Sequence, residues 1–424
     1  MKNYPALLAC LAATLLLGLH SNVSGGDWSQ FRGPGGLGVS AETGLPVEWS
    51  GTENLTWRTE LPGYGASSPI TLDGKVYVTC YSGYGTDGDA EKMEDLTLHV
   101  VCVNRADGSI AWDQKVKPEL PETERVRDHG YAAATPATDG EFLYVFFGKT
   151  GVLKFDLNGK QIWQSDVGSG LNGWGCGTSP VLFENLVIVN ASVESGSLVA
   201  IDKESGTEVW RAGGMKSSWN TPQLVRLANG PPELVVSVKD YILGFDPKTG
   251  KELWRCDGIS DYVCPSVISQ DGIVYVIGGR TSKAIAVRAG GRGDVTDTHK
   301  LWEAKAGSNV TSPIIHDGHM YWVSDRNSVA YCVRLSDGEV LYSERFRDQP
   351  YASATAGDGK IYVVTRNGGT YVLAATPKFT QLAHNKFEDR STFNASPAIS
   401  NGQIFLRSDK YLYCVGKKPS VAVD

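Results

Sequence analysis

The 424-residue sequence lacks the features that mark several common classes of protein. Its 40 basic residues form no stripe and are outnumbered by 47 acidic ones, so nucleic acid is not an expected partner. Beyond the first residues, no segment approaches the ~20 consecutive apolar residues that a membrane-spanning helix needs. No long stretch has the 3.6-residue apolar period of an amphipathic helix. These absences predict an all-β chain without a transmembrane segment.

Recognisable catalytic and metal-binding motifs are also missing. No Gly-x-Ser-x-Gly elbow occurs, and the seven histidines lack the spacing of metal ligands. The glycine-rich run 33–38 is followed by neither a lysine nor a helix, which argues against a phosphate-binding loop. The acidic stretch 87–95 lacks the bidentate glutamate of a calcium loop and is interpreted as a solvated insertion. No metal site is therefore expected.

Cysteine usage indicates no disulfide framework. Of the eight cysteines, Cys10 lies in the N-terminal leader, and the odd number that remains is scattered through strand-like runs. Three of them, Cys102, Cys332 and Cys414, share one position of a repeated unit and are predicted to be small apolar fillers. Cys256 and Cys264 are the one candidate disulfide pair that lies close in sequence.

The N-terminus has the parts of an export signal. Lys2 precedes an apolar run over residues 6–19, and the small residues of 23–25 suit cleavage. Cys10 lies before most of that run, whereas the acylated cysteine of a lipoprotein follows it. We expect residues 1–25 to be a signal peptide and the mature protein to lie in the periplasm or outside the cell.

A repeated unit is the strongest signal that the sequence does carry. Each unit starts with a small hydroxyl residue or a cysteine, usually followed by proline, and continues through short alternating strands. From the second unit onward the starts are about 41 to 48 residues apart, the period of β-propeller blades. The hydroxyl groups at the starts are expected to form hydrogen bonds between blades. The eight starts are Ser68-Pro69, Thr135-Pro136, Ser179-Pro180, Thr221-Pro222, Cys264-Pro265, Ser312-Pro313, Ser353-Ala354 and Ser396-Pro397.

Most units close on an aromatic residue that follows a glycine-containing turn, as in the segment from Asp107 to Trp112. The glycine permits the positive φ of a tight hairpin, and the aromatic ring offers a flat surface where one blade meets its neighbour. In the seventh unit Leu382 replaces the aromatic residue, so weaker docking is expected there. The closing aromatics are Trp112, Trp163, Trp210, Trp254, Trp302 and Tyr342.

The two ends of the chain are expected to share the eighth blade. The last unit ends after three strands, the third of which is Tyr411–Val415, and the segment Asn54–Leu61 with Trp57 has the character of an outermost strand. Joining them removes an exposed sheet edge. The predicted architecture is an eight-bladed β-propeller with four-stranded antiparallel blades. Its predicted parts are a signal peptide (1–25), an N-terminal arm (26–53), the propeller (54–416) and a C-terminal tail (417–424).

The Gly-Lys-x-x-x-Trp repeat resembles the repeats of pyrroloquinoline quinone (PQQ) dehydrogenases and of the BamB propellers. More closely, the chain is similar to the exported PQQ-like repeat proteins that are abundant in planctomycete bacteria. The resemblance covers essentially the whole mature chain and implies a quinoprotein-type propeller, but a fold does not imply an activity. The stretches that carry it are Trp28–Pro34, His129–Tyr131, Asp261–Ser266 and Tyr321–Asp325.

The resemblance to PQQ dehydrogenases implies a check for cofactor residues. Those enzymes hold calcium through Glu, Asn and Asp, with an Asp as base and a Trp beneath the quinone, and many add two adjacent cysteines. This sequence has no Cys-Cys pair, no compact Glu/Asn/Asp set that matches residue by residue, and mostly short connections between units. We expect no cofactor. The alternative is a PQQ- and calcium-dependent oxidoreductase acting on alcohols or sugars.

A ligand site is expected where the chain enters each innermost strand, because these entry segments ring the central channel. They combine aromatic rings, amides, an imidazole and a carboxylate, which suits a polar ligand with flat faces, such as a sugar or an inserted peptide. In the alternative interpretation, the aromatics plug the channel and the asparagines cap turns. The candidates are His129, Tyr131, Trp174, Trp219, Asn220, Asp261, Tyr262, Asn309, Tyr351, Phe393 and Asn394.

These observations predict a monomeric, non-catalytic exported propeller that binds a protein or polysaccharide partner in the cell envelope. A third alternative, a polysaccharide hydrolase or lyase, needs paired carboxylates at the channel mouth. Only Asp261 is visible among the entry segments.

Overall fold

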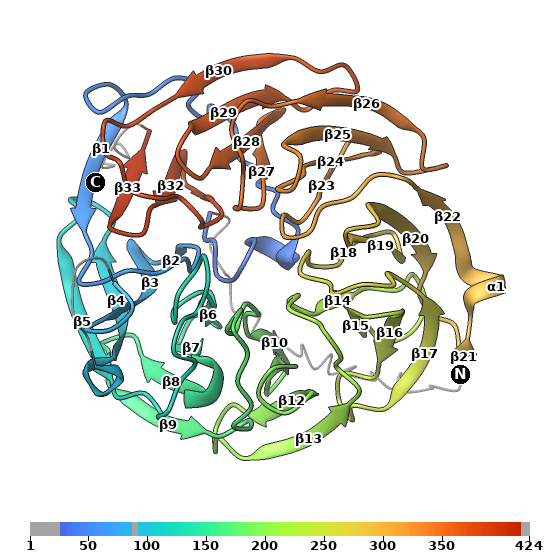
Figure 1. The fold of residues 1–424 in the computed structure, drawn as a ribbon, viewed down its shortest axis with the longest axis horizontal. Coiled ribbons are helices and arrows are strands. Elements are labelled where there is room, and N and C mark those ends of the chain that lie inside the picture. Colours follow the sequence, from blue (N-terminus) through green and yellow to red (C-terminus); the bar gives the residue numbers. More distant parts are fainter. Residues whose placement is uncertain (1–25, 87–91, 417–424) are drawn as a thin grey trace, which may run out of the picture.

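The computed structural model describes residues 26–86 and 92–416, which form a ring of eight antiparallel β-sheets around a central channel (Figure 1). This confirms the predicted eight-bladed propeller. The predicted signal peptide, the C-terminal tail and part of the acidic insertion lie outside the described residues. Among the described residues, no helix has the length and apolarity needed to span a membrane.

Blades 1 to 4 follow one another along the chain, each built from its innermost strand outward. Blade 1 has β2 (Ile70–Leu72), β3 (Lys75–Ser82), β4 (Thr97–Asn104) and β5 (Ile110–Val116); blade 2 has β6 (Ala137–Thr138), β7 (Phe142–Phe146), β8 (Val152–Asp156) and β9 (Gln161–Ser165); blade 3 has β10 (Val181–Phe183), β11 (Leu186–Ala191), β12 (Ser197–Asp202) and β13 (Glu208–Gly213); blade 4 has β14 (Gln223–Val225), β15 (Glu233–Val238), β16 (Tyr241–Phe245) and β17 (Glu252–Asp257).

Blades 5 to 8 continue in the same way. Blade 5 has β18 (Ile268–Gln270), β19 (Ile273–Gly278), β20 (Lys283–Arg288) and β22 (Lys300–Ala304); blade 6 has β23 (Ile314–His316), β24 (His319–Val323), β25 (Val329–Arg334) and β26 (Val340–Arg345); blade 7 has β27 (Thr355–Gly357), β28 (Lys360–Thr365), β29 (Gly369–Ala374) and β30 (Gln381–Asn385); blade 8 has β31 (Ala398–Ser400), β32 (Gln403–Arg407), β33 (Tyr411–Val415) and β1 (Leu55–Glu60). Short additional elements are η1 (Pro34–Gly36), η2 (Met93–Asp95), η3 (Gly148–Thr150), β21 (Gly293–Asp294) and α1 (Thr296–His299).

The hydrophobic core lies between neighbouring blades. Middle strands such as β3 and β11 are buried on both faces, whereas outer strands such as β17 alternate between buried and exposed side chains. The repeated cysteines Cys102, Cys332 and Cys414 are buried in this core, as predicted. The proposed Cys256–Cys264 disulfide is wrong, because both thiols are free. Cys256 packs in the core against blade 5, while Cys264 lines the channel mouth.

A closed ring of hydrogen bonds joins the entry points of the eight innermost strands. At each blade a backbone N–H donates to the side-chain hydroxyl at the equivalent position of the next blade, over 2.9 to 3.3 Å. The predicted start of blade 5 is wrong by two residues: Ser266, not Cys264, belongs to the ring, and β18 begins two residues later, as in the other blades. We call this set the hydroxyl ring; its members are Ser68, Thr135, Ser179, Thr221, Ser266, Ser312, Ser353 and Ser396.

Five seams between blades share one clasp, in which a tryptophan of an outer strand covers a turn glycine of the next blade. Trp210, for example, donates from its indole N–H to the Pro247 carbonyl at 3.1 Å, and a Cβ added to Gly250 would lie 2.5 Å from its ring. Every one of these glycines has a positive φ, which favours glycine. The five pairs are Trp57–Gly108, Trp112–Gly159, Trp163–Gly206, Trp210–Gly250 and Trp302–Gly338.

The seam between blades 4 and 5 is built differently. Trp254 donates to the buried carboxylate of Glu233 at 2.7 Å, and Glu233 also accepts from Arg292 at 2.9 Å. Strand β21 pairs in parallel with β17 and adds a fifth strand to blade 4. The Arg292-Gly293-Asp294 tripeptide is therefore part of this seam.

The chain ends complete blade 8 as predicted. Strand β1 pairs antiparallel with β33, with Trp57 opposite Cys414 and Glu60 opposite Tyr411. Blade 7 has Leu382 where other blades have an aromatic residue, and its side chain is 43% exposed. The N-terminal arm covers this part of the ring, since the buried Trp49 donates its backbone N–H to Asn385 at 3.0 Å.

The first part of the arm runs through the channel at one end of the ring. The blue segment that carries η1 lies at the centre of the ring in Figure 1. Its hydrogen bonds reach the inner parts of five blades, so the arm closes this end of the channel. The contacts are Trp28 with Thr71, Ser29 with Thr138, Gly35 with Gln223, Arg32 with Pro313, and Gly38 and Ser40 with Ala356.

Candidate ligand-binding site at the channel mouth

The opposite end of the channel opens into a cavity of about 360 Å³, which we call the mouth. Its walls are the entry segments just before the innermost strands. Six hydroxyl-ring members also line it, as does Phe31 of the arm; the six are Ser68, Ser179, Ser266, Ser312, Ser353 and Ser396. Seven of the eleven residues predicted from the sequence line this one cavity: His129, Trp174, Trp219, Tyr262, Asn309, Tyr351 and Asn394.

Two other predicted residues position the mouth from outside it. Asn220 is buried, and its amide donates to the Ser218 hydroxyl at 2.9 Å and to the Ser237 carbonyl. Asp261 accepts from the backbone N–H of Tyr262 at 2.8 Å and from that of Arg280 at 2.9 Å. Both therefore fix the course of loops.

The last two predicted residues also lie outside the mouth. Phe393 is buried in the core of blade 8, where its ring lies 5.8 Å from that of Tyr413. Tyr131 lies in an adjoining groove of about 1060 Å³, with its hydroxyl donating to the Thr123 carbonyl at 2.6 Å. The groove and the mouth share Asp128, His129, Arg366 and Asn394.

Three arginines lie over aromatic rings around the mouth. The guanidinium of Arg280 is 5.1 Å from the centre of the Tyr262 ring, and that of Arg366 is 5.1 Å from the Tyr351 ring. Arg127 lies 5.3 Å from the exposed Trp174 ring. Such cation–π contacts hold a guanidinium in place without neutralising it.

Sequence analysis missed Arg280, Arg366 and Asp325, which line the mouth from a second set of loops. These residues follow the second strand of blades 5, 7 and 6. Because adjacent strands of a blade run in opposite directions, the turn after the second strand lies at the same end of the blade as the entry to the first. A search of those turns as well as the entry segments could have found them.

Several contacts hold the mouth residues of blades 2, 7 and 8 together. Arg366 pairs with Asp128 at 2.8 Å, and the Asn394 amide donates to the Asp128 carbonyl at 2.5 Å. His129 Nδ1 lies 3.3 Å from the Tyr351 hydroxyl. Burial lowers the pKa of His129 to about 4, so its imidazole is neutral at pH 7.

Three buried polar atoms of the mouth residues have no hydrogen-bond partner among the described residues. They are Nε2 of His129, Oδ1 of Asn309 and Oδ1 of Asn394. A buried polar atom without a partner costs free energy, so such atoms are uncommon in folded proteins. All three atoms belong to residues that line the mouth.

The two carboxylates that line the mouth are already engaged. Asp128 is paired with Arg366, and Asp325 accepts from the Ser308 hydroxyl at 2.7 Å and from the Asn309 N–H at 2.8 Å. Within residues 26–86 and 92–416, no three His, Cys, Asp or Glu side chains form a group that could hold a metal ion. Calcium needs six to eight convergent oxygens, and the two carboxylates of the mouth are already held by protein groups, so they do not offer a free donor set for the calcium of PQQ dehydrogenases.

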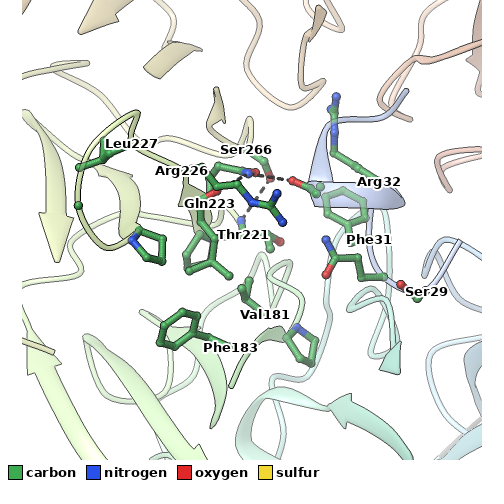
Figure 2. Close-up of a pocket in the computed structure, with 18 residues that line it drawn as sticks. Ser29, Phe31, Arg32, Val181, Phe183, Thr221, Gln223, Arg226, Leu227 and Ser266 are labelled. Carbon is green, nitrogen blue, oxygen red and sulfur yellow. Dashed lines mark hydrogen bonds between the residues drawn. The ribbon is translucent and has the colours of Figure 1, made fainter. Parts of the chain in front are cut away.

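A second cavity, of about 580 Å³, lies between the arm and blades 3 to 5 (Figure 2). Phe31 lines both this cavity and the mouth. Figure 2 shows Arg226 reaching into the cavity from blade 4, whereas the Arg32 side chain extends away from it. Its remaining wall is largely apolar, with Val181, Phe183 and Leu227 among the lining residues.

Comparison with known proteins gives one family and several similar folds. The family model for the outer membrane protein assembly factor BamB matches residues 97–344. No curated protein matches the sequence.

Among solved structures, BamB from Moraxella catarrhalis is 14% identical, covers 86% of this chain and 98% of its own, and has a TM-score of 0.60. The quinohemoprotein alcohol dehydrogenase from Comamonas testosteroni is 11% identical, with 92% and 80% covered and a TM-score of 0.63. The computationally designed Ika8 protein is 12% identical, with 84% and 98% covered and a TM-score of 0.57. At such identities the likeness shows the fold alone.

Proposed function

The chain belongs to the family of the outer membrane protein assembly factor BamB, and from this premise we propose that it is an exported, non-catalytic propeller that binds a protein or glycan partner in the cell envelope. The family is named for a factor in protein assembly at a membrane, and that role supports a scaffold that binds a partner. The proposed binding site is the mouth.

One observation carries the proposal: the mouth gathers side chains that the repeat does not require. The hydroxyl ring beneath it presents equivalent groups in all eight blades, whereas the mouth differs from blade to blade. Three of its residues, His129, Asn309 and Asn394, also carry buried atoms without a hydrogen-bond partner. A non-catalytic role is supported by Asp128 and Asp325, because both carboxylates are already held by other groups.

A binding titration with a defined panel tests this proposal. The purified protein would be titrated by calorimetry with peptidoglycan fragments, lipopolysaccharide, neutral and acidic oligosaccharides, and an unfolded outer-membrane protein. We expect saturable binding to at least one class. Trp219→Ala should abolish it, and Tyr241→Ala, which removes an exposed aromatic residue at the start of strand β16, should not. Failure of every class to bind, or full binding by Trp219→Ala, would refute the proposal.

The oxidoreductase alternative rests on the similarity to quinoprotein dehydrogenase folds. It is tested by adding PQQ and calcium to the purified protein and recording the absorbance spectrum. A saturable quinone spectrum, together with reduction of a dye in the presence of an alcohol or sugar, would replace the scaffold proposal. We expect neither, because Asp128 and Asp325, the two carboxylates of the mouth, are already held by other groups.

A further inference from the structure

Resting on the proposed function, we propose that the ligand of the mouth is an acidic glycan, in which a carboxylate-bearing sugar unit binds beside Arg280. Three properties of the mouth together specify this class: cations without an ion-pair partner, unpartnered hydrogen-bond acceptors, and aromatic rings held in fixed orientations.

The arginine side chains without an ion-pair partner indicate a ligand that carries an anionic group. Among the described residues, Arg280 in the mouth and Arg127 in the adjoining groove form no ion pair, while Arg366 is paired with Asp128. The chain as a whole has a net charge of −7, so these guanidiniums do not reflect a generally basic surface. A guanidinium recognises a carboxylate through two parallel hydrogen bonds. Arg280 is exposed and lies over the Tyr262 ring, so its charge is accessible to a ligand.

The acceptor atoms without a hydrogen-bond partner indicate a ligand that carries hydroxyl groups. The amide of Asn394 is oriented by its bond to the Asp128 carbonyl, which leaves Oδ1 as an acceptor. Oδ1 of Asn309 is a second acceptor without a partner. A sugar ring carries several hydroxyl groups close together, and each can donate one hydrogen bond.

The aromatic rings of the mouth indicate a ligand with flat apolar faces. The indole N–H of Trp219 donates to the Gly175 carbonyl at 3.0 Å, and its ring meets Tyr262 edge to face at 6.4 Å. Trp174 is 43% exposed at the rim. Rings held in this way can pack against the C–H face of a sugar at little entropic cost. The adjoining groove continues the mouth past His129 and Arg366, so oligomers should bind more tightly than a single sugar.

The backbone around Trp219 favours a glycan over an extended peptide. The entry segments of blades 4 and 5 already pair with each other: Trp219 N–H donates to the Val263 carbonyl at 2.8 Å, and Val263 N–H donates to the Ser217 carbonyl at 2.9 Å. A peptide strand therefore finds no free backbone to pair with here. Recognition depends on side chains, which suits a sugar.

The test compares an oligogalacturonate tetramer with the same tetramer fully methyl-esterified, by calorimetry on the purified protein. Esterification removes the negative charge of each carboxyl group and adds a methyl group to it. We expect the acid to bind at least about tenfold more tightly than the ester, and added salt to weaken the binding of the acid. Arg280→Gln should weaken acid binding about tenfold and leave ester binding unchanged. The matched control is Arg226→Gln, an exposed arginine at the cavity beneath the arm, which should change neither.

Equal binding of acid and ester, or full acid binding by Arg280→Gln, would overturn the inference. Tighter binding of a glutamate-rich peptide than of the acid tetramer would also overturn it, in favour of a protein ligand. If a neutral glycan or a protein binds and Trp219→Ala abolishes that binding, this inference fails while the proposed function holds. If no class binds, both fail.

Discussion

The hydroxyl ring and the mouth are separated by only a few residues of chain, yet they differ in every respect that matters for function. The ring is uniform, and its members bond to one another around the whole circle. The mouth above it varies from blade to blade and leaves His129, Asn309 and Asn394 with unpartnered atoms. This comparison indicates that the repeated residues build the scaffold, whereas residues that differ from blade to blade form the proposed binding site.

Five changes, ordered by their expected effect on stability, test this division. The largest should follow from deleting residues 54–61, which removes β1 from blade 8 and the Trp57–Gly108 clasp from blade 1. We expect loss of cooperative unfolding in circular dichroism, because the deletion exposes a sheet edge and opens the ring. The control is Leu382→Ala in the exposed outer strand of blade 7. A deletion variant that melts as the intact protein does would refute closure by β1.

Adding a methyl group at the glycine of one tryptophan–glycine clasp should cause the next largest loss of stability. Gly250→Ala adds a Cβ 2.5 Å from the Trp210 ring at a φ of +67°, and we expect a loss of about 3 kcal/mol in the free energy of unfolding. The control, Gly359→Ala, has a φ of +66° but no atom within 4 Å, and should cost about 1 kcal/mol. Equal losses in chemical denaturation would show that the clasp contributes nothing.

Breaking the hydroxyl ring should cost less. Thr135→Val, at a ring member that does not line the mouth, leaves the buried N–H of Ser68 without its acceptor, which lies at 2.9 Å in the native protein. We expect a loss of about 1 to 3 kcal/mol in the free energy of unfolding, with ligand binding unchanged. Ser343→Ala on the exposed strand β26 is the control and should be neutral. If Thr135→Val abolished binding without lowering stability, the ring and the mouth could not be assigned separate roles.

A pH-dependent effect should appear at Glu194 of blade 3, which is buried outside the mouth. Burial, with the nearby charge of Glu122, raises the pKa of Glu194 to about 8. Between its ordinary pKa of 4.5 and about 8, the unfolded chain loses this proton while the folded protein retains it, so stability falls as the pH rises through this window.

Glu194→Gln should remove this fall in stability at high pH, because glutamine does not titrate. The variant should match the native protein at pH 4.5 and melt at a higher temperature at pH 9. The same comparison for the exposed Glu204→Gln should show no difference at either pH. A lower melting temperature for Glu194→Gln at pH 9 would contradict the assignment.

The smallest effect on stability is expected at the rim of the mouth. Trp174→Ala removes an exposed ring and should change the free energy of unfolding by about 0.5 kcal/mol or less. Binding of the acid tetramer should nevertheless weaken about fivefold to tenfold. Ile162→Ala, equally exposed on outer strand β9, should affect neither quantity. Unchanged binding by Trp174→Ala would remove this residue from the site.

The fold was largely predictable because blades repeat their chemistry. Prolines and hydroxyl residues at strand entries, Gly-containing turns and closing tryptophans place seven of the eight blade starts and the shared eighth blade. Blade 5 was misplaced because Cys264-Pro265 imitates the repeated Ser-Pro pair, while its hydroxyl, Ser266, comes two residues later. The contacts of Leu45 and Trp49 with blade 7 were not predicted, because the arm lies outside the repeated unit and carries no repeated pattern that would show where it binds.

The mouth was predictable only in part. The positions just before each innermost strand include most of the predicted residues that line the mouth. It could not separate Trp219, which lines the cavity, from its neighbour Asn220, which is buried beneath it, since adjacent side chains point in opposite directions. Arg280 and Arg366 were not predicted because they lie on the turns that follow the second strand of their blades. Their positions over Tyr262 and Tyr351 depend on tertiary packing.

A crystal structure of the protein soaked with the oligogalacturonate tetramer tests the central claim most directly. The account predicts density in the mouth, with a carboxylate beside Arg280, a sugar face against Trp219 and hydroxyl groups on Asn394 and Asn309. Density confined to the cavity between the arm and blades 3 to 5, or an empty mouth at saturating tetramer, would contradict it.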